Sequence, residues 1–309
     1  MNKIKSFIKN ISPFNNRNDM PMILYVIKII IIFLVFKFGA ELAGEGIVLS
    51  LHFACGKNPL NGEMFDLNTI MLITYYGYGF MIGMIILFWK LFQQKTLSEL
   101  GFSGPVRSYL TGAAVGALLV VISVALVVLT GAFRYNGIFD NIDTTTVVLM
   151  LGGFILQGAL EEVLCRGIVQ QLLQKRSALI AVGVSAALFT VPHISSMDFK
   201  APAIAVTAII NLILVSLVFS LLTIRYRSIW AACGMHSIWN YILYSILGLN
   251  LSGNDEIASS VFSMSSVGEN VLNGGVYGIE ASIFTTAVLG AAVMLLLLFN
   301  TRKPKTQMI

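Results

Sequence analysis

The sequence predicts an all-α fold, a polytopic membrane helical bundle of about eight transmembrane helices, on the basis of three observations. Of the 309 residues, 57% are hydrophobic and only 11% are charged, whereas a soluble domain carries about 25% charged residues. Long apolar runs recur along the chain, and basic and acidic segments alternate between them. This composition excludes a water-soluble globule, a disordered chain and a disulfide-stapled secreted module.

The apolar runs have the length of membrane-spanning helices. A helix that crosses a bilayer needs roughly 20 mostly apolar residues, and none of the runs shows the polar–apolar alternation of barrel strands. In chain order the predicted spans are 22–48, 68–90, 109–132, 145–173, 177–196, 201–224, 228–249 and 281–300. Two glycine pairs, Gly79–Gly83 and Gly112–Gly116, have the small-xxx-small spacing that permits helices to approach closely.

The charges of the connecting segments predict the orientation in the membrane. Lys and Arg gather before the first run, after the second, fourth and sixth runs, and at the C-terminal end, while the other segments are acidic or near neutral. Because basic segments stay on the cytoplasmic side, we expect a multi-pass protein of the cell membrane with both termini in the cytoplasm. The net charge of +5 reflects this bias, and no basic cluster with interleaved aromatics indicates nucleic-acid binding.

The same features divide the chain into five parts. A basic cytoplasmic segment, expected to be retained rather than cleaved, precedes the N-terminal transmembrane helices. A central core, an extracytoplasmic loop, and a last transmembrane helix with a basic tail follow. The boundaries are 1–21, 22–132, 145–249, 250–280 and 281–309.

Ionisable side chains inside the fourth run mark a candidate functional site, because each costs about 2.5–3.5 kcal/mol on insertion scales. Glu162 and Arg166 stand at i and i+4 with the acid first, which is the favourable order for an ion pair. Neighbours on a helix point about 100° apart, so Glu161 faces another direction and lacks this partner. We expect Glu162 and Arg166 to be structural, and Glu161 to be free for a proton, a metal or a water.

Two of the three histidines lie in other predicted spans. His193 follows Pro192, where the missing backbone donor favours a kink. His236 and Asn240 stand at i and i+4 and therefore share one helix face. If these side chains converge with Glu161, they could activate a water and stabilise an oxyanion. They could also bind zinc, although no H-E-x-x-H pattern is present.

Three motifs in this order resemble those of the CPBP family, the CAAX protease and bacteriocin-processing (Abi) proteins. They are Glu161-Glu162-x-x-x-Arg166, Phe189-x-x-x-His193 and His236-x-x-x-Asn240. The flanking Arg227-Ser228-Ile229-Trp230 and Gly234-Met235-His236 also resemble that family's approach to its third motif. The resemblance covers about residues 145–250. It implies peptide-bond hydrolysis within the membrane, on a peptide precursor or a membrane protein.

The resemblance also implies a role for each motif position. Glu161 would be the general base on the attacking water, assisted by His193. His236 and Asn240 would stabilise the oxyanion. Arg166 would hold its segment together through its acidic partner.

The cofactor and the class of protein stay open at this point. A zinc ion held by Glu161, His193 and His236 is the alternative to a glutamate-dependent mechanism without a firmly bound metal. A non-enzymatic bacteriocin-immunity or membrane scaffold protein with the same fold, and a proton-coupled transporter, are the alternatives to an enzyme. The intact hydrolytic set favours the enzyme, and missing inverted repeats count against a transporter. Glu280, at the start of the last run, is expected at the membrane interface.

Overall fold

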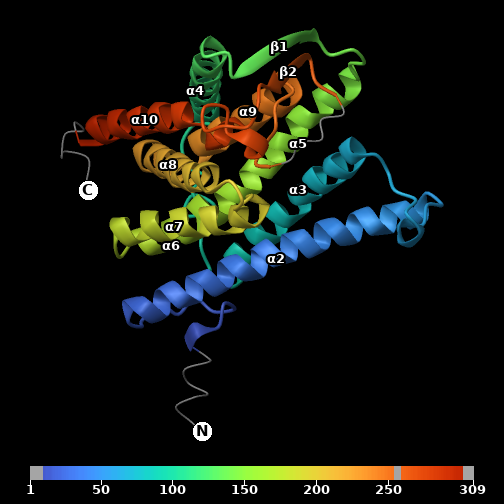
Figure 1. Ribbon diagram of the computed structural model, residues 1–309. Helices are drawn as coiled ribbons and strands as arrows, with labels where there is room; N and C mark the ends of the chain where they lie inside the picture. The colour runs from blue at the N-terminus through green and yellow to red at the C-terminus, as the bar shows by residue number, and fades with distance from the viewer. Residues whose placement is uncertain (1–9, 254–258, 302–309) are drawn as a thin grey trace.

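The computed structural model describes residues 10–253 and 259–301, which form a helical bundle with one small sheet (Figure 1). Seven helical segments of this described part are long and apolar enough to cross a membrane, by length and composition. Their helices are α2 (Met22–Ala54), α3 (Leu67–Leu91), α4 (Arg107–Leu129), α5 (Thr144–Glu162), α7 (Ala178–His193), α8 (Pro202–Tyr226) and α10 (Ile283–Thr301). The predicted multi-pass helical fold is therefore confirmed.

The predicted span at 228–249 is shorter than expected. It forms α9 (Trp230–Tyr241), of 12 residues, and a π-helical continuation, Ile242–Ile246, of 5 residues. Together they lie at the short end of the range of about 17–25 residues for a bilayer-crossing helix. Helix α9 is a largely buried central helix in contact with α4, α5 and α8. Its apolar side chains face other helices, which hydropathy alone does not distinguish from lipid.

Helix α5 continues without a break into a π-helical segment, Val163–Gln170, and then into α6 (Gln171–Gln174). The run predicted at 145–173 is thus one span, but its hydrogen-bonding register changes directly after the two adjacent glutamates. The sequence does not indicate this change. Short π-helical turns inside α-helices are rare and occur frequently at functional sites.

Two strands that the sequence does not predict join distant parts of the chain. Strand β1 (Phe133–Ile138) follows α4 and pairs antiparallel with β2 (Phe262–Ser266). Because β2 lies in the segment predicted as a loop at 250–280, the pairing holds part of that segment against the bundle (Figure 1). A strand this short and this polar carries no clear alternation in sequence.

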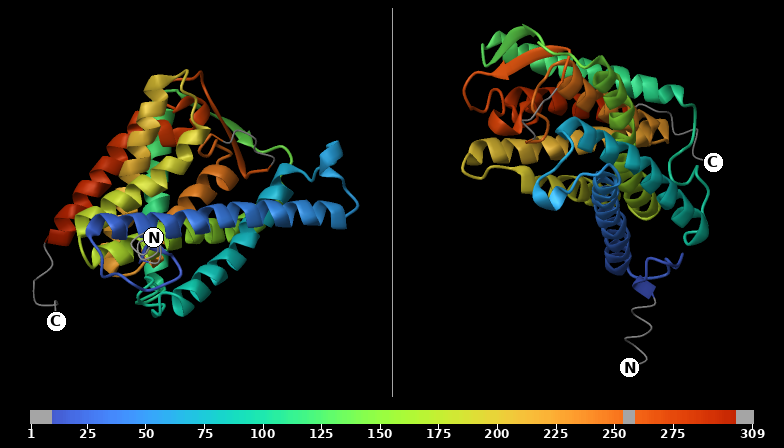
Figure 2. Two further views of the ribbon diagram at one scale, coloured as in Figure 1. Left: turned by 90° about the horizontal axis from the view of Figure 1, so that it is seen from below. Right: turned by 90° about the vertical axis from the view of Figure 1, so that its right-hand side faces the viewer.

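The helices are arranged so that α9 lies inside the bundle and α2 lies at its edge. Figures 1 and 2 show α2 beside α3, with the C-terminal end of α2 projecting from the rest of the molecule. Helices α8 and α10 pack together elsewhere in the bundle. The candidate site residues lie on α5, α7 and α9.

Glycines allow α4 and α9 to pack closely. A Cβ atom on Gly112 would overlap the Ala231 carbonyl oxygen of α9, and one on Gly234 would overlap the Tyr109 carbonyl oxygen of α4. A Cβ atom on Gly83 would meet nothing within 4 Å. The close approach predicted for the Gly112–Gly116 pair is confirmed, whereas the pair that contains Gly83 does not bring two backbones together.

Replacing Gly112 by alanine is therefore expected to push α4 and α9 apart. Overpacking of this kind costs about 1–3 kcal/mol, and the thermal unfolding temperature in detergent should fall. Gly83→Ala is the matched control, since its added methyl group has open space. Equal unfolding temperatures for both variants would show that the α4–α9 contact tolerates the methyl group.

Candidate active site

Helix α5 presents its two adjacent glutamates to different surroundings. Glu162 is fully buried, and its Oε1 accepts a hydrogen bond of 3.1 Å from Nη1 of Arg166. The Glu161 side chain is 24% exposed and lines a cavity of about 180 Å³, which we name the Glu161 cavity. The predicted contact between Glu162 and Arg166 is present, and only Glu161 is open to a water molecule.

Arg166 is enclosed by aromatic rings and by α8. Its guanidinium carbon lies 4.8 Å from the ring centroid of Phe189 and 5.0 Å from that of Phe219. Its Nη2 donates to the carbonyl oxygen and to the hydroxyl of Ser216. A desolvated cation–π contact is worth about 2 kcal/mol. The guanidinium therefore ties the end of the α5 span to α7 and α8.

His236 of α9 lies between the two glutamates. Its Nδ1 is 3.0 Å from Oε1 of Glu162, and its Nε2 is 4.0 Å from Oε2 of Glu161. The ring stacks on Phe219, with centroids 5.1 Å apart and planes inclined by 14°. An ionised carboxylate only accepts hydrogen bonds, so Nδ1 donates to Glu162 and Nε2 is left for other partners. Glu162 thus orients His236, a contact that the spacing of the motifs does not reveal.

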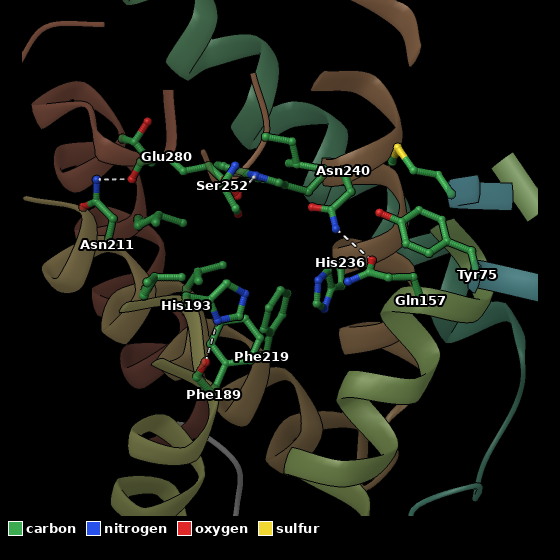
Figure 3. Close-up of a pocket in the computed structure, with 17 residues that line it drawn as sticks. Tyr75, Gln157, Phe189, His193, Asn211, Phe219, His236, Asn240, Ser252 and Glu280 are labelled. Atoms are coloured by element: carbon green, nitrogen blue, oxygen red, sulfur yellow. Dashed lines mark hydrogen bonds between the residues drawn. The ribbon is translucent and has the colours of Figure 1, made fainter. Parts of the chain in front are cut away.

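His193 and His236 face each other across a second cavity, of about 160 Å³, which we name the His236 cavity (Figure 3). His193 lies at the end of α7, and its Nδ1 donates to the Phe189 carbonyl oxygen at 2.8 Å. This bond leaves Nε2 without a partner from its own helix turn. Asn240 lines the same cavity, and its Nδ2 donates to Oε1 of Gln157 at 2.9 Å.

The two cavities share part of their lining. Three residues line both: Phe189, His193 and Ser252. Glu161 lines one cavity, while His236 and Asn240 line the other. The structure therefore brings the four predicted site residues together around two adjacent cavities.

The structure adds Gln157, which the sequence prediction misses. Its Nε2 donates to Oε1 of Glu161 at 2.6 Å, and its Oε1 accepts the bond from Asn240. Gln157 therefore orients Glu161 and links it to α9. The signal in the sequence is the spacing of four residues between Gln157 and Glu161, which places both side chains on one helix face.

Gln157→Leu is expected to lower any activity of the site by about tenfold to a hundredfold. This range corresponds to the loss of a hydrogen bond to a charged group, about 1.5–3 kcal/mol. Gln174→Leu, at the far end of the same span, is the control and should keep full activity. The measurement is turnover at equal protein level. Equal activity of the two variants would show that Gln157 does not contribute to the activity of the site.

The arrangement does not fit the zinc alternative. Within residues 10–253 and 259–301, no three His, Cys, Asp or Glu side chains lie close enough together to hold a metal ion. Zinc would require Glu161, His193 and His236 around one ion. Nδ1 of each histidine is bonded, to the Phe189 carbonyl oxygen and to Glu162, so zinc could use only Nε2 of each ring.

The bundle and its side chains define a class of protein: a multi-pass membrane protein whose helices enclose a glutamate–histidine site. Residues 143–242 match the family model described as Type II CAAX prenyl endopeptidase Rce1-like. The matched range contains α5, α7, α8 and α9. No curated protein matches the chain significantly. The match confirms the resemblance to the CPBP family over this part of the chain and supports an intramembrane CAAX-type protease fold for it.

Proposed function

We propose that the protein is an intramembrane endopeptidase that hydrolyses a peptide bond of a membrane-associated protein or a peptide precursor. The unequal surroundings of the two glutamates support this proposal. Glu162 is buried and bonded to Arg166 and His236, whereas Glu161 lines a cavity. Among the described residues, Glu161 has no Lys or Arg nitrogen within 4.0 Å. A carboxylate that water can reach, and that no fixed cation neutralises, is suited to act as a general base.

In the proposed first step, Glu161 takes a proton from a water molecule. The water oxygen bonds to the carbonyl carbon of the scissile peptide, and the carbonyl electron pair moves to oxygen. Asn240 donates to this oxyanion through Nδ2, and His236 donates through Nε2 in its imidazolium form. The carboxylates 3.0 and 4.0 Å from the ring offset the charge of that form. Stabilisation of the oxyanion is usually the largest single contribution to catalysis of this kind.

In the second step, the intermediate collapses and the carbon–nitrogen bond breaks. Glu161 transfers the proton that it took from water to the leaving nitrogen, so one carboxyl group serves as base and then as acid. His193 lies across the His236 cavity (Figure 3). From there its Nε2 assists by hydrogen bonding to the water or to the leaving group.

The proposed setting is the cell membrane, with both termini in the cytoplasm. Seven apolar helices among the described residues fit a multi-pass membrane protein. With the shorter α9 and its continuation as an eighth crossing, the number of crossings is even and both termini lie on one side, and the alternation of loop charges supports the cytoplasmic side. The segment between α2 and α3, which contains Cys55, would then lie outside the cell.

The native cysteines provide a test of this orientation. Cys55 is exposed, whereas Cys165 and Cys233 are buried. A membrane-impermeant maleimide should therefore label the wild-type protein in intact cells, and Cys55→Ser should abolish the labelling. Labelling that appears only after the membrane is opened would place this segment in the cytoplasm instead.

The proposed activity is tested by comparing membrane peptides from cells that carry the wild-type protein, Glu161→Ala or Glu45→Ala. Glu45 is an exposed carboxylate of α2 outside both cavities, so it is the matched control. Cleavage products should be present with the wild-type protein and the control, and absent with Glu161→Ala at equal protein level. Identical products in all three would refute hydrolysis and favour a non-enzymatic immunity or scaffold role.

A further inference from the structure

Glu280 is a third carboxylate near the site, besides Glu161 and Glu162. It belongs to the short 3₁₀ turn Ile279–Ala281, directly before α10. It lines the His236 cavity beside Ser252 and Asn211 (Figure 3). Among the described Asp, Glu, Lys and Arg side chains, it is the one that lines this cavity.

Neutral groups hold the Glu280 carboxylate in place. Its Oε2 accepts hydrogen bonds from the backbone nitrogen and the hydroxyl of Ser252, at 2.8 and 2.6 Å. Its Oε1 accepts a bond of 3.3 Å from Nε1 of Trp239. Within the described part of the chain, no Lys, Arg or His nitrogen lies within 4.0 Å of it. The three bonds orient the carboxylate, but they leave its charge without a countercharge.

The contact with Trp239 places Glu280 close to the groups of the proposed reaction. Trp239 stands three residues after His236 on α9, and residues at this spacing are neighbours on a helix surface. Trp239 also lines the same cavity. Much of the remaining wall is apolar: Met71, Leu212, Val215, Phe219, Leu251 and Leu289. A ligand in this cavity therefore meets an apolar wall, one anionic group and the reacting groups.

A purely structural role would not require the charge of Glu280. Ser252 has a φ of 50°, a left-handed conformation that is uncommon outside glycine, and its two bonds to Glu280 stabilise this conformation. A neutral glutamine oxygen could accept the same two bonds. A carboxylate that is partly removed from water costs free energy unless a cation approaches it. The negative charge of Glu280 thus indicates a cationic ligand, beyond a structural role in stabilising the Ser252 conformation.

We infer that Glu280 is a specificity-determining residue that binds a basic group of the peptide substrate, an ammonium or a guanidinium. The inference rests on the proposed function, because the position of the peptide chain follows from hydrolysis of its scissile bond beside His236. An extended chain advances about 3.3 Å per residue. Since Trp239 connects Glu280 to the turn of α9 that carries His236, the basic group lies within a few residues of the scissile bond.

The test uses the purified full chain in detergent and short apolar peptides that differ at one point. In one series a central residue is Lys, Arg, norleucine or Glu. In the other series the N-terminus is free or acetylated, which distinguishes a side chain from the terminal ammonium as the source of the cation. Binding is measured by fluorescence anisotropy, and cleavage of the same peptides is measured by mass spectrometry.

In one of the two series, we expect the cationic peptides to bind about tenfold more tightly than the neutral peptide, as for a hydrogen bond to a charged group. Glu280→Gln should abolish this preference, and Glu280→Lys should invert it toward the Glu peptide. Ser252→Ala removes a donor but keeps the charge, so it should retain the preference. Glu269→Gln is the matched control, because Glu269 belongs to the same segment but lies outside this cavity.

The outcomes separate this inference from the proposed function. Equal binding of cationic and neutral peptides to the wild-type chain overturns the inference, whatever the variants do. A preference that persists in Glu280→Gln also overturns it. A Glu280-dependent preference without any cleavage supports the inference and counts against hydrolysis. Cleavage without a preference supports hydrolysis and overturns the inference.

Discussion

Peptide cleavage should fall by a factor of about 10²–10⁴ when Glu161 is replaced by glutamine, the usual contribution of a general base. The unfolding temperature in detergent should stay close to that of the wild-type protein. Glutamine keeps the size of the side chain and can still hydrogen-bond to Gln157, but it cannot accept the proton from water. Glu161 is partly exposed and forms no ion pair with Lys or Arg in the described structure, so no buried cation loses its partner.

Glu162→Gln is the matched control, because it makes the same chemical change one residue along the chain. It removes the countercharge of the fully buried Arg166, so its unfolding temperature should fall. Activity should fall as well, because Glu162 orients His236. If Glu162→Gln is inactive with an unchanged unfolding temperature, while Glu161→Gln cleaves at a near wild-type rate, the roles of the two glutamates are reversed.

The largest losses of stability should follow from removing one partner of the Glu162–Arg166 pair. Both side chains are 0% exposed, and their charged atoms are 3.1 Å apart. Removing one partner leaves an uncompensated buried charge, which costs about 3–5 kcal/mol. Arg166→Ala also loses the contacts of the guanidinium with Phe189 and Phe219. Unfolding temperature in detergent and the amount of protein in the membrane measure both effects.

A double replacement tests whether the two residues act as a pair. Glu162→Leu combined with Arg166→Met removes both charges, and apolar replacements of a buried pair are often neutral or stabilising. The double variant should therefore recover part of the stability, but it should stay inactive because Nδ1 of His236 loses its acceptor. Losses that simply add would contradict the coupling expected for residues in contact.

An exposed ion pair of the same chain provides the comparison. Lys175 and Glu99 are 2.9 Å apart, and the side chains remain 60% and 37% exposed. Exposed pairs of this kind contribute about 0–1 kcal/mol. Glu99→Gln should therefore change the unfolding temperature far less than Glu162→Gln does.

The different partners of the two glutamates were predictable because they depend on one helix. The spacing of Glu162 and Arg166 sets their contact whatever surrounds the helix, and the same period turns Glu161 away from Arg166. The ion pair between Glu162 and Arg166 forms although Val163–Gln170 is π-helical. The length of the apolar runs predicted eight spans, and seven of these runs form helices long and apolar enough to cross a membrane.

Contacts between helices were not predictable in the same way. The sequence placed His236 and Asn240 on one face, but not the bond from His236 to Glu162 or that from Asn240 to Gln157. The position of Glu280 in the cavity also depends on how the segment before α10 folds back onto α9.

The sequence by itself therefore determined the spans, the Glu162–Arg166 pair and the set of motif residues. Only the tertiary structure decided which carboxylate orients His236, which residue links Glu161 to α9, and which anionic group lines the His236 cavity. The physical reason is that the helical period positions side chains along one helix, and this period is readable from the sequence. The distance and crossing of two helices depend instead on which surfaces can approach, as at Gly112 and Gly234 between α4 and α9.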